Sequence, residues 1–95
     1  MIILIAYDIA DNNTRLKLAS YLQSKGLARI QKSVFTGTIL PATLKDVDRA
    51  LPGFVKNSDD VIHLIPLLEY SLKNMKHYGN PLGQIKLERE TLRVV

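Results

Sequence analysis

The residue best placed for chemistry is Asp8, which directly follows the apolar run from Ile2 to Tyr7. A carboxylate where a buried strand gives way to a polar loop is in a common position for a functional group. One carboxylate cannot hold Mg²⁺ by itself, because the ion needs near-octahedral oxygen coordination and usually keeps several waters. Two copies of Asp8 that meet across a dimer axis could hold one ion between them. The alternative is that Asp8 caps a turn or pairs with Arg15.

Basic side chains could form a track for phosphate groups. Arg15 and Lys17 lie at the expected start of a helix, where backbone N–H groups already favour anions. Arg29 and Lys32 are expected to project from the second strand region. The chain has 13 Lys and Arg against nine Asp and Glu, a net charge of +4 and a pI near 9.5. Such a pI is typical of nucleic-acid binding, although a solvated basic surface would give the same pattern.

The other candidate groups favour structural roles. Phe35 is expected in the core more than as a platform for base stacking. Tyr7 shares its strand face with two isoleucines, and its ordinary pKa near 10 makes it a poor base at neutral pH. His63 and His77 have no partners at a metal-ligand spacing, and the pair Asp59-Asp60 fits a turn better than a metal site. The chain has no cysteine, which excludes disulfides and thiolate metal sites.

Strands and helices must position these residues. The first strand, residues 2–8, is apolar on both faces until Asp8, which predicts a central strand covered on each side. Helices can cover one face, and another subunit is the natural cover for the other. A helix is predicted over about residues 12–25, with capping side chains at 11–14 and Gly26 in the left-handed position after it.

The next segment, residues 27–40, is rich in β-forming residues and has no helical period. Periodicity alone leaves two alternatives: a hairpin that bends near Gln31-Lys32-Ser33, or one long bulged strand. A second helix follows, marked by apolar residues at Leu44, Val47 and Leu51 and ended by Pro52-Gly53.

Two more strands and a tail complete the chain. Residues 61–65 predict a strand, 69–74 a short helical turn and 75–78 a last core strand. This order predicts an α+β sandwich in which two helices lie on one face of a mostly antiparallel sheet. Residues 1–80 are expected to form the core domain, and the apolar tail 81–95 to pack on the sheet edge of a dimer partner. The first apolar run is too short to span a membrane and lacks the flanks of a signal peptide, so a cytoplasmic protein is expected.

A set of residues also resembles a known family. The strand that ends in Tyr7-Asp8 is followed by Arg15, Gly26, Arg29 and the segment Gln31-Lys32-Ser33-Val34-Phe35. This pattern is similar to that of the smaller core protein of the CRISPR spacer-adaptation complex, a family of dimeric endoribonucleases. The match runs in order from residue 2 to about residue 68, and its two main pieces at this separation are specific.

The resemblance implies a ferredoxin-like fold and a homodimer with an exchanged C-terminal strand. It implies a Mg²⁺-dependent endonuclease acting on single-stranded RNA or duplex DNA, which also bridges the partner integrase during spacer capture. In such a site Asp8 takes the metal position, surrounded by five further residues: Tyr7, Arg15, Arg29, Ser33 and Phe35. Some relatives have an arginine where this chain has Lys17, which keeps the charge and loses the bidentate fork.

Three functions are consistent with these features. The first is a metal-dependent endonuclease built on paired Asp8 carboxylates. The second is a dimeric DNA-binding bridge of the integration complex with no chemistry of its own. The third is a ferredoxin-like regulatory module for a small ligand, which has no pocket signature and leaves the positive charge unexplained.

Overall fold

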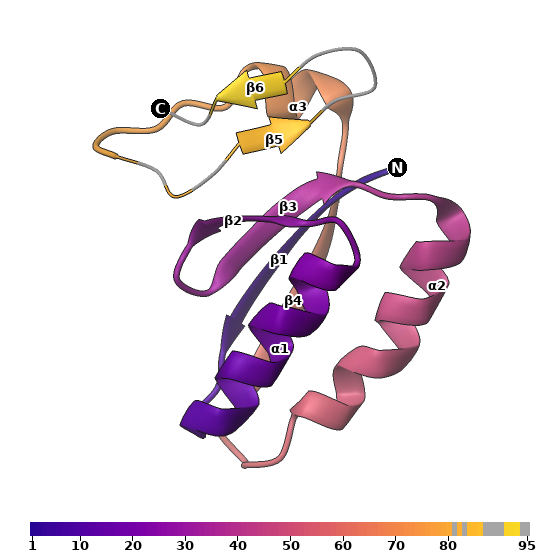
Figure 1. The fold of residues 1–95 in the computed structure, drawn as a ribbon, viewed down its shortest axis with the longest axis vertical. Coiled ribbons are helices and arrows are strands. Elements are labelled where there is room, and N and C mark those ends of the chain that lie inside the picture. Colours follow the sequence, from indigo (N-terminus) through magenta and orange to yellow (C-terminus); the bar gives the residue numbers. More distant parts are fainter. Residues whose placement is uncertain (81, 83, 87–90, 94–95) are drawn as a thin grey trace.

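The computed structural model describes residues 1–80, 82, 84–86 and 91–93. Figure 1 shows a sheet with two long helices packed in front of it. In chain order the elements are β1 (Ile2–Asp8), α1 (Asn12–Ser24), β2 (Ala28–Gln31), β3 (Val34–Thr38), α2 (Pro41–Ala50), the 3₁₀ helix η1 (Leu51–Phe54), β4 (Val61–Leu67), α3 (Glu69–Lys73), β5 (Gln84–Lys86) and β6 (Thr91–Arg93).

The main sheet has the strand order β2-β3-β1-β4, and every neighbouring pair is antiparallel. In the register, Ile5 of β1 lies opposite Phe35 of β3 on one side and Leu64 of β4 on the other. Strand β1 is therefore central, as its apolar character predicts. The predicted α+β sandwich with two helices on one face is confirmed, and its topology is ferredoxin-like.

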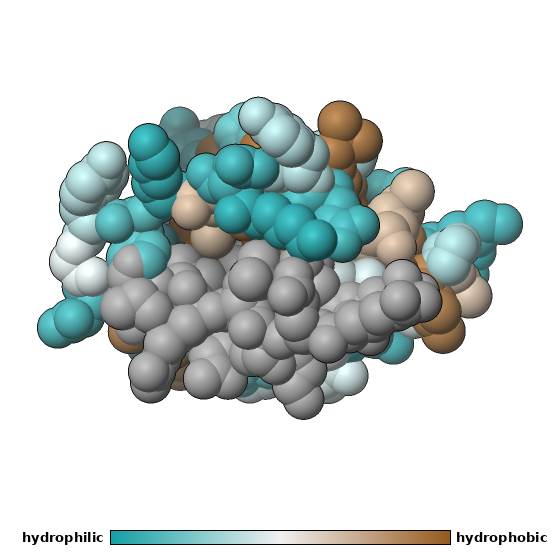
Figure 2. Space-filling model, turned by 90° about the horizontal axis from the view of Figure 1, so that it is seen from above, coloured by the Kyte–Doolittle hydropathy of each residue, from teal (hydrophilic) through white to brown (hydrophobic). Residues whose placement is uncertain are grey.

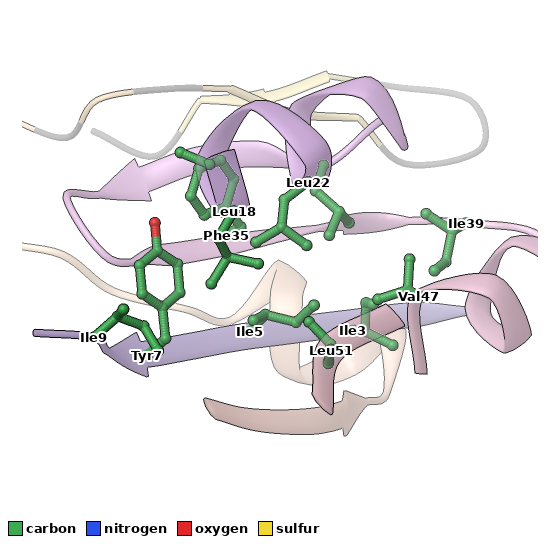
Figure 3. Packing of buried hydrophobic residues seen from close by; sticks show 12 residues of the cluster. Ile3, Ile5, Tyr7, Ile9, Leu18, Leu22, Phe35, Ile39, Val47 and Leu51 are labelled. Carbon is green, nitrogen blue, oxygen red and sulfur yellow. The ribbon is translucent and has the colours of Figure 1, made fainter. Parts of the chain in front are cut away.

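The core lies between the sheet and the helices α1 and α2. Figure 3 shows Ile3, Ile5 and Tyr7 projecting from β1 into the same layer as the helix residues Leu18 and Val47. Their side chains form one buried cluster with those of neighbouring elements. Alternation along β1 puts every second residue on this face, so Asp8 belongs to the opposite face.

Helix α1 has the predicted capping residues at both ends. At its start, the Asp11 carboxylate accepts hydrogen bonds from the backbone N–H and the hydroxyl of Thr14, at 2.9 and 2.8 Å. At its end, Gly26 has φ +92°, which L side chains rarely adopt. The Gly26 N–H donates to Gln23 O at 3.0 Å and the Leu27 N–H to Leu22 O at 3.2 Å, the bond pattern of a Schellman cap.

The segment after α1 is a hairpin, which decides between the two alternatives left by the sequence. Strands β2 and β3 pair with each other and turn at Lys32-Ser33. Their register shifts between Arg29 and Gln31, so a local irregularity accompanies the hairpin. The shift leaves Arg29 opposite Phe35 and Gln31 opposite Val34.

The C-terminal part differs from expectation at one place. The short helix α3 is confirmed, but the strand predicted over residues 75–78 is wrong, because this segment has no strand pairing. Its apolar residue Met75 instead packs against a second small cluster of Ile2, Ile30 and Leu72. The packing of Met75 on this cluster, and not strand pairing, accounts for its apolar side chain.

The described parts of the tail pair with each other. Strands β5 and β6 form a two-stranded antiparallel sheet, and β5 lies near β2 and β3 of the same chain. The packing of the tail on a dimer partner stays a prediction. The tail residues Leu87, Val94 and Val95 lie outside the described residues.

The face of the sheet opposite α1 and α2 is only partly covered. Leu4 and Ala6 of β1 are half-buried there, and Val61 and Ile65 of β4 are 40% and 44% exposed. Figure 2 looks down on the end of the molecule where α3 lies, and the coloured surface seen there is mainly hydrophilic, with hydrophobic residues in separate groups. In the part of the chain that is described, no helix has the length and apolar character needed to cross a membrane.

Candidate functional site

The Asp8 carboxylate lies at the end of the central strand and is exposed to solvent. Asp8 is opposite Val61 of β4, and alternation places it on the open face with Leu4 and Ala6. Among the described residues, no three His, Cys, Asp or Glu side chains are grouped closely enough to hold a metal ion. Asp8 by itself cannot hold Mg²⁺, and the ion would fit here with a second carboxylate from another chain and several waters.

Tyr7 lies on the opposite face of the sheet from Asp8 and is buried in the core. Its ring stacks on that of Phe35, with centroids 6.2 Å apart and an angle of 17° between the planes. Burial raises the pKa of the Tyr7 phenol, although the positive charges of Arg29 and Arg15 oppose this shift. The phenol therefore stays neutral at physiological pH and cannot act as a general base.

Arg29 stabilises the turn of the hairpin. Its Nε–H and Nη2–H donate to the carbonyl oxygen of Lys32 at 3.1 and 2.8 Å. The guanidinium also lies over the Phe35 ring, with Cζ 5.5 Å from the centroid, a cation–π geometry. Phe35 itself has no exposed surface, so it supports Arg29 and Tyr7 and offers no face to a base.

Arg15 braces the loop that follows Asp8. Its Nη1–H donates to the carbonyl oxygens of Ile9 and Ala10 at 3.1 and 3.3 Å, and its Nη2–H donates to Asn12 Oδ1 at 2.8 Å. These bonds close the β1–α1 loop on itself. They also engage both terminal nitrogens, which leaves fewer of the five N–H donors of Arg15 for a phosphate.

Asp60, which the sequence places only in a turn, is a positioning residue for the loop after Asp8. Its Oδ1 accepts from the Ala10 N–H at 3.0 Å, and its Oδ2 accepts from the N–H groups of Lys56 and Asn57 at 3.0 and 2.9 Å. These three hydrogen bonds lower the pKa of the Asp60 carboxyl. The side chain thus ties the loop after Asp8 to the loop before β4. The one signal in the sequence was an acidic residue ending the polar run 57–60.

Of the remaining candidate residues, Ser33 takes part in a hydrogen bond through its backbone, whereas the side chains of two lysines make none in the part of the chain that the structure describes. The Ser33 carbonyl accepts the Tyr7 N–H at 3.0 Å, which fixes the turn beside the end of β1. Lys17 and Lys32 are exposed, and their ammonium groups make no hydrogen bond or ion pair within the described residues. The structure therefore brings Tyr7, Arg29 and Phe35 together at the hairpin turn, while the Asp8 side chain lies on the other face of the sheet.

Comparison with known proteins adds a family match. Residues 1–75 match the family model described as CRISPR associated protein Cas2. The chain is 36% identical over 81 residues to a protein of Pyrobaculum aerophilum named CRISPR-associated endoribonuclease Cas2 2, covering 85% of this chain and 89% of that protein. It is 38% identical over 69 residues to CRISPR-associated endoribonuclease Cas2 1 of Archaeoglobus fulgidus, covering 73% of each.

Two further comparisons concern a fused relative and a solved structure. A Thermoproteus tenax protein named CRISPR-associated endonuclease Cas1/endonuclease Cas2 fusion is 37% identical over 59 residues, which are 62% of this chain and 22% of that protein. The crystal structure of Streptococcus pyogenes Cas2 at pH 6.5 superposes with a TM-score of 0.73 at 23% identity, over 83% of this chain and all of that one. That likeness supports the same fold.

Proposed function

This chain belongs to the CRISPR-associated protein Cas2 family, and from that premise we propose that it is a metal-dependent endonuclease of CRISPR adaptation that acts in the cytoplasm on RNA or duplex DNA. The names of its relatives, which are endoribonucleases, support nuclease activity. The observation that carries the proposal is the exposed Asp8 carboxylate at the end of the central strand, on the sheet face that α1 and α2 leave open.

The proposed metal ligands are the Asp8 carboxylates of two chains. An exposed aspartate that belongs to no group of three metal-ligating side chains in the described residues fits a shared site, where each chain gives one oxygen ligand and water completes the coordination. A bound Mg²⁺ would stabilise negative charge on a phosphate oxygen. The chain's own part is to hold Asp8 in place, through the β1 ladder and through the loop bonds of Arg15 and Asp60.

A homodimer follows from the same reasoning. The open face carries four apolar residues along β1 and β4, namely Leu4, Ala6, Val61 and Ile65. A second copy that covers this strip would bury apolar surface and bring two Asp8 residues towards one axis. A chain of 95 residues has a small core for its surface, so burial in a dimer would add to its stability.

Phosphate groups would be bound by basic side chains near this site. Lys17 and Lys32 are the freest of the four predicted contacts, since the guanidinium groups of Arg15 and Arg29 bond to their own backbone. Binding through these lysines would be electrostatic and largely independent of sequence. Replacing either one should reduce the salt slope of binding by about one unit.

The proposed protein partner is the CRISPR integrase subunit. The Thermoproteus tenax relative joins a Cas1 and a Cas2 endonuclease in one chain, which supports a working association of the two. A second function, a dimeric DNA-binding bridge without catalysis, is favoured by a specific observation: each chain supplies one carboxylate, and the neighbouring Tyr7 phenol stays neutral.

The test is cleavage and binding by Asp8→Asn, measured on labelled single-stranded RNA and duplex DNA with Mg²⁺ or chelator. Loss of the charged oxygen ligand should lower metal-dependent cleavage by at least about a hundredfold, while binding persists or improves as negative charge leaves the phosphate path. Asp59→Asn, at an exposed carboxylate before β4, is the matched control and should cleave normally.

Each alternative result has a definite meaning. Cleavage that survives in Asp8→Asn would exclude the metal site. Absence of cleavage in the wild type, together with intact binding and spacer integration, would favour the bridge.

A further inference from the structure

A small pocket lies at the β2 edge of the main sheet, away from the apolar strip of β1 and β4. It has a volume of about 170 Å³ and lies between the end of β2 and the segment 75–80. Pockets for drug-sized ligands usually measure about 300–1,000 Å³, so this one suits a single flat ring system. Its floor is apolar, made in part by Ile30 and Met75.

The rim of the pocket has the side chains that recognise an unpaired base. Tyr78 is 92% exposed, which leaves its ring free to stack. Gln31 and Asn80 contribute two amide groups that can both donate and accept, and neither makes a side-chain hydrogen bond within the described residues. Aromatic stacking combined with hydrogen bonds to base edges is how proteins bind single-stranded nucleic acid.

Two further observations favour this ligand over a cation or an apolar group. Among the described residues, no acidic side chain lines the pocket, and Lys76 contributes positive charge to it. His77 also lines it, and the His77 Nε2 is buried with no hydrogen-bond partner, alone among the side-chain nitrogens and oxygens of the described residues. Buried polar atoms in proteins nearly always have a partner, and none of the described residues supplies one here.

The pocket is on the same face as Asp8. Gln31 lies opposite Val34, and Val34 lies opposite Ala6, so these residues share the open face on which Asp8 also lies. Two strand spacings separate Gln31 from β1, a distance of roughly 10 Å. A single strand with one phosphate at Asp8 can therefore reach the pocket with a base a short way along the chain.

We propose that this pocket binds one unpaired nucleobase of a single strand and positions the strand at Asp8. The proposal rests on the proposed function, because it assumes that nucleic acid is the ligand of this face. It adds a preference for unpaired over fully paired substrate, since a base inside a duplex cannot enter.

The test is binding of the full-length protein in chelator, so that no strand is cut, to a labelled single-stranded RNA and to a blunt duplex of the same sequence. Tyr78→Ala should weaken single-strand binding about fivefold or more, the usual effect of losing one stacked base, and leave duplex binding unchanged. Tyr78→Phe should retain the affinity. Tyr70→Ala, at a 75% exposed tyrosine of α3 outside the pocket, is the matched control and should bind like the wild type.

The outcomes separate the pocket from the proposed function. Equal single-strand affinity of Tyr78→Ala and Tyr70→Ala would overturn the pocket. The proposed binding of nucleic acid would still stand if the wild type binds in a salt-dependent way. An equal loss on single strand and duplex would also overturn it, because a base pocket cannot act on paired bases. A wild type that binds neither ligand would overturn both.

Discussion

Asp60 and Arg15 hold the loop after Asp8 from its two kinds of backbone group, the N–H and the carbonyl. Asp60 accepts the N–H of Ala10, and Arg15 donates to the carbonyls of Ile9 and Ala10. Two charged side chains thereby fix two peptide groups that no strand or helix includes. The position of Asp8 at the end of β1 depends on this loop as well as on the ladder with β4.

Replacing Asp60 tests this arrangement. In Asp60→Asn one oxygen becomes an NH₂ group, which cannot accept the backbone N–H groups of Lys56 and Asn57. We expect the melting temperature at pH 7 to fall by roughly 5–10 °C in thermal unfolding followed by circular dichroism. Asp59→Asn, beside it and exposed, should melt within about 2 °C of the wild type.

The effect should also depend on pH. Hydrogen bonds lower the pKa of Asp60 in the folded protein, so its carboxylate favours folding above its ordinary pKa near 3.8. That contribution is lost as the pH falls through the lowered folded pKa. The difference between wild type and Asp60→Asn should therefore shrink as the pH falls below about 3.8. A difference independent of pH would show that shape, and not charge, is what Asp60 contributes.

The site could be predicted from the sequence only where strand alternation applies. Alternation along β1 already put Tyr7 with the isoleucines, and the structure has it in the core on the face away from Asp8. The bonds of Arg15 and Arg29 to nearby carbonyls could not be predicted, because they depend on loop shapes that no periodicity encodes. The sequence predicts both arginines as phosphate contacts, which stays a prediction, and in the structure both also donate to backbone carbonyls.

Among the elements, α1 has ends defined by single residues. Asp11 caps its start, and Gly26 lets the chain leave in a left-handed conformation. In Gly26→Ala the added Cβ meets no atom within 4 Å, so any cost comes from the backbone alone. We expect a loss of about 1 kcal/mol in the free energy of unfolding, measured by urea denaturation.

Gly53→Ala provides the control for this prediction. Gly53 also has open space around a built Cβ, and its φ is not in the left-handed region. The change should be within about 0.5 kcal/mol of the wild type, or slightly stabilising. Equal destabilisation of both variants would mean that the conformation of Gly26 is not what ends the helix.

Elements were predictable to the extent that their signals are local. The caps of α1 are local signals, and the helix begins and ends where they predict. The proline-glycine pair is also local, and it lies in the short 3₁₀ helix that directly follows α2. Whether residues 27–40 turn or bulge depends on pairing with β1, which the sequence does not state. The error at 75–78 has a related cause, since Met75 is apolar because it packs on Ile2 and Leu72 and not because it joins the ladder.

The whole molecule has one sheet face closed by helices and one left partly open. On the face covered by α1 and α2, the side chains of Ile3, Ile5 and Phe35 are completely buried. The partly open face has the apolar strip on β1 and β4, with Asp8 at the end of β1. The pocket lies on the same face, at the β2 edge of the sheet. The pocket is at the edge strand β2, two strands from β1, so a partner confined to the strip would not cover it.

Ile65→Asp should separate the proposed dimer into monomers. Ile65 is 44% exposed in the single chain and lies opposite Leu4 at one end of the strip. An aspartate there would be buried against the second copy without a partner, at a cost of several kcal/mol. The dimer dissociation constant, measured by size-exclusion chromatography with light scattering, should rise about a hundredfold or more.

Val55→Asp is the matched control for the dimer, because Val55 is 43% exposed in the loop after η1 and outside the strip. Val55→Asp should remain dimeric. This result would show that Ile65→Asp acts because Ile65 lies on the open face, and not because a charge was added to an exposed apolar residue. Cleavage and dimerisation should be lost together in Ile65→Asp if two Asp8 carboxylates form the site. A monomeric Ile65→Asp that still cleaves at the wild-type rate would show that one Asp8 is sufficient and would remove the reason for a shared metal.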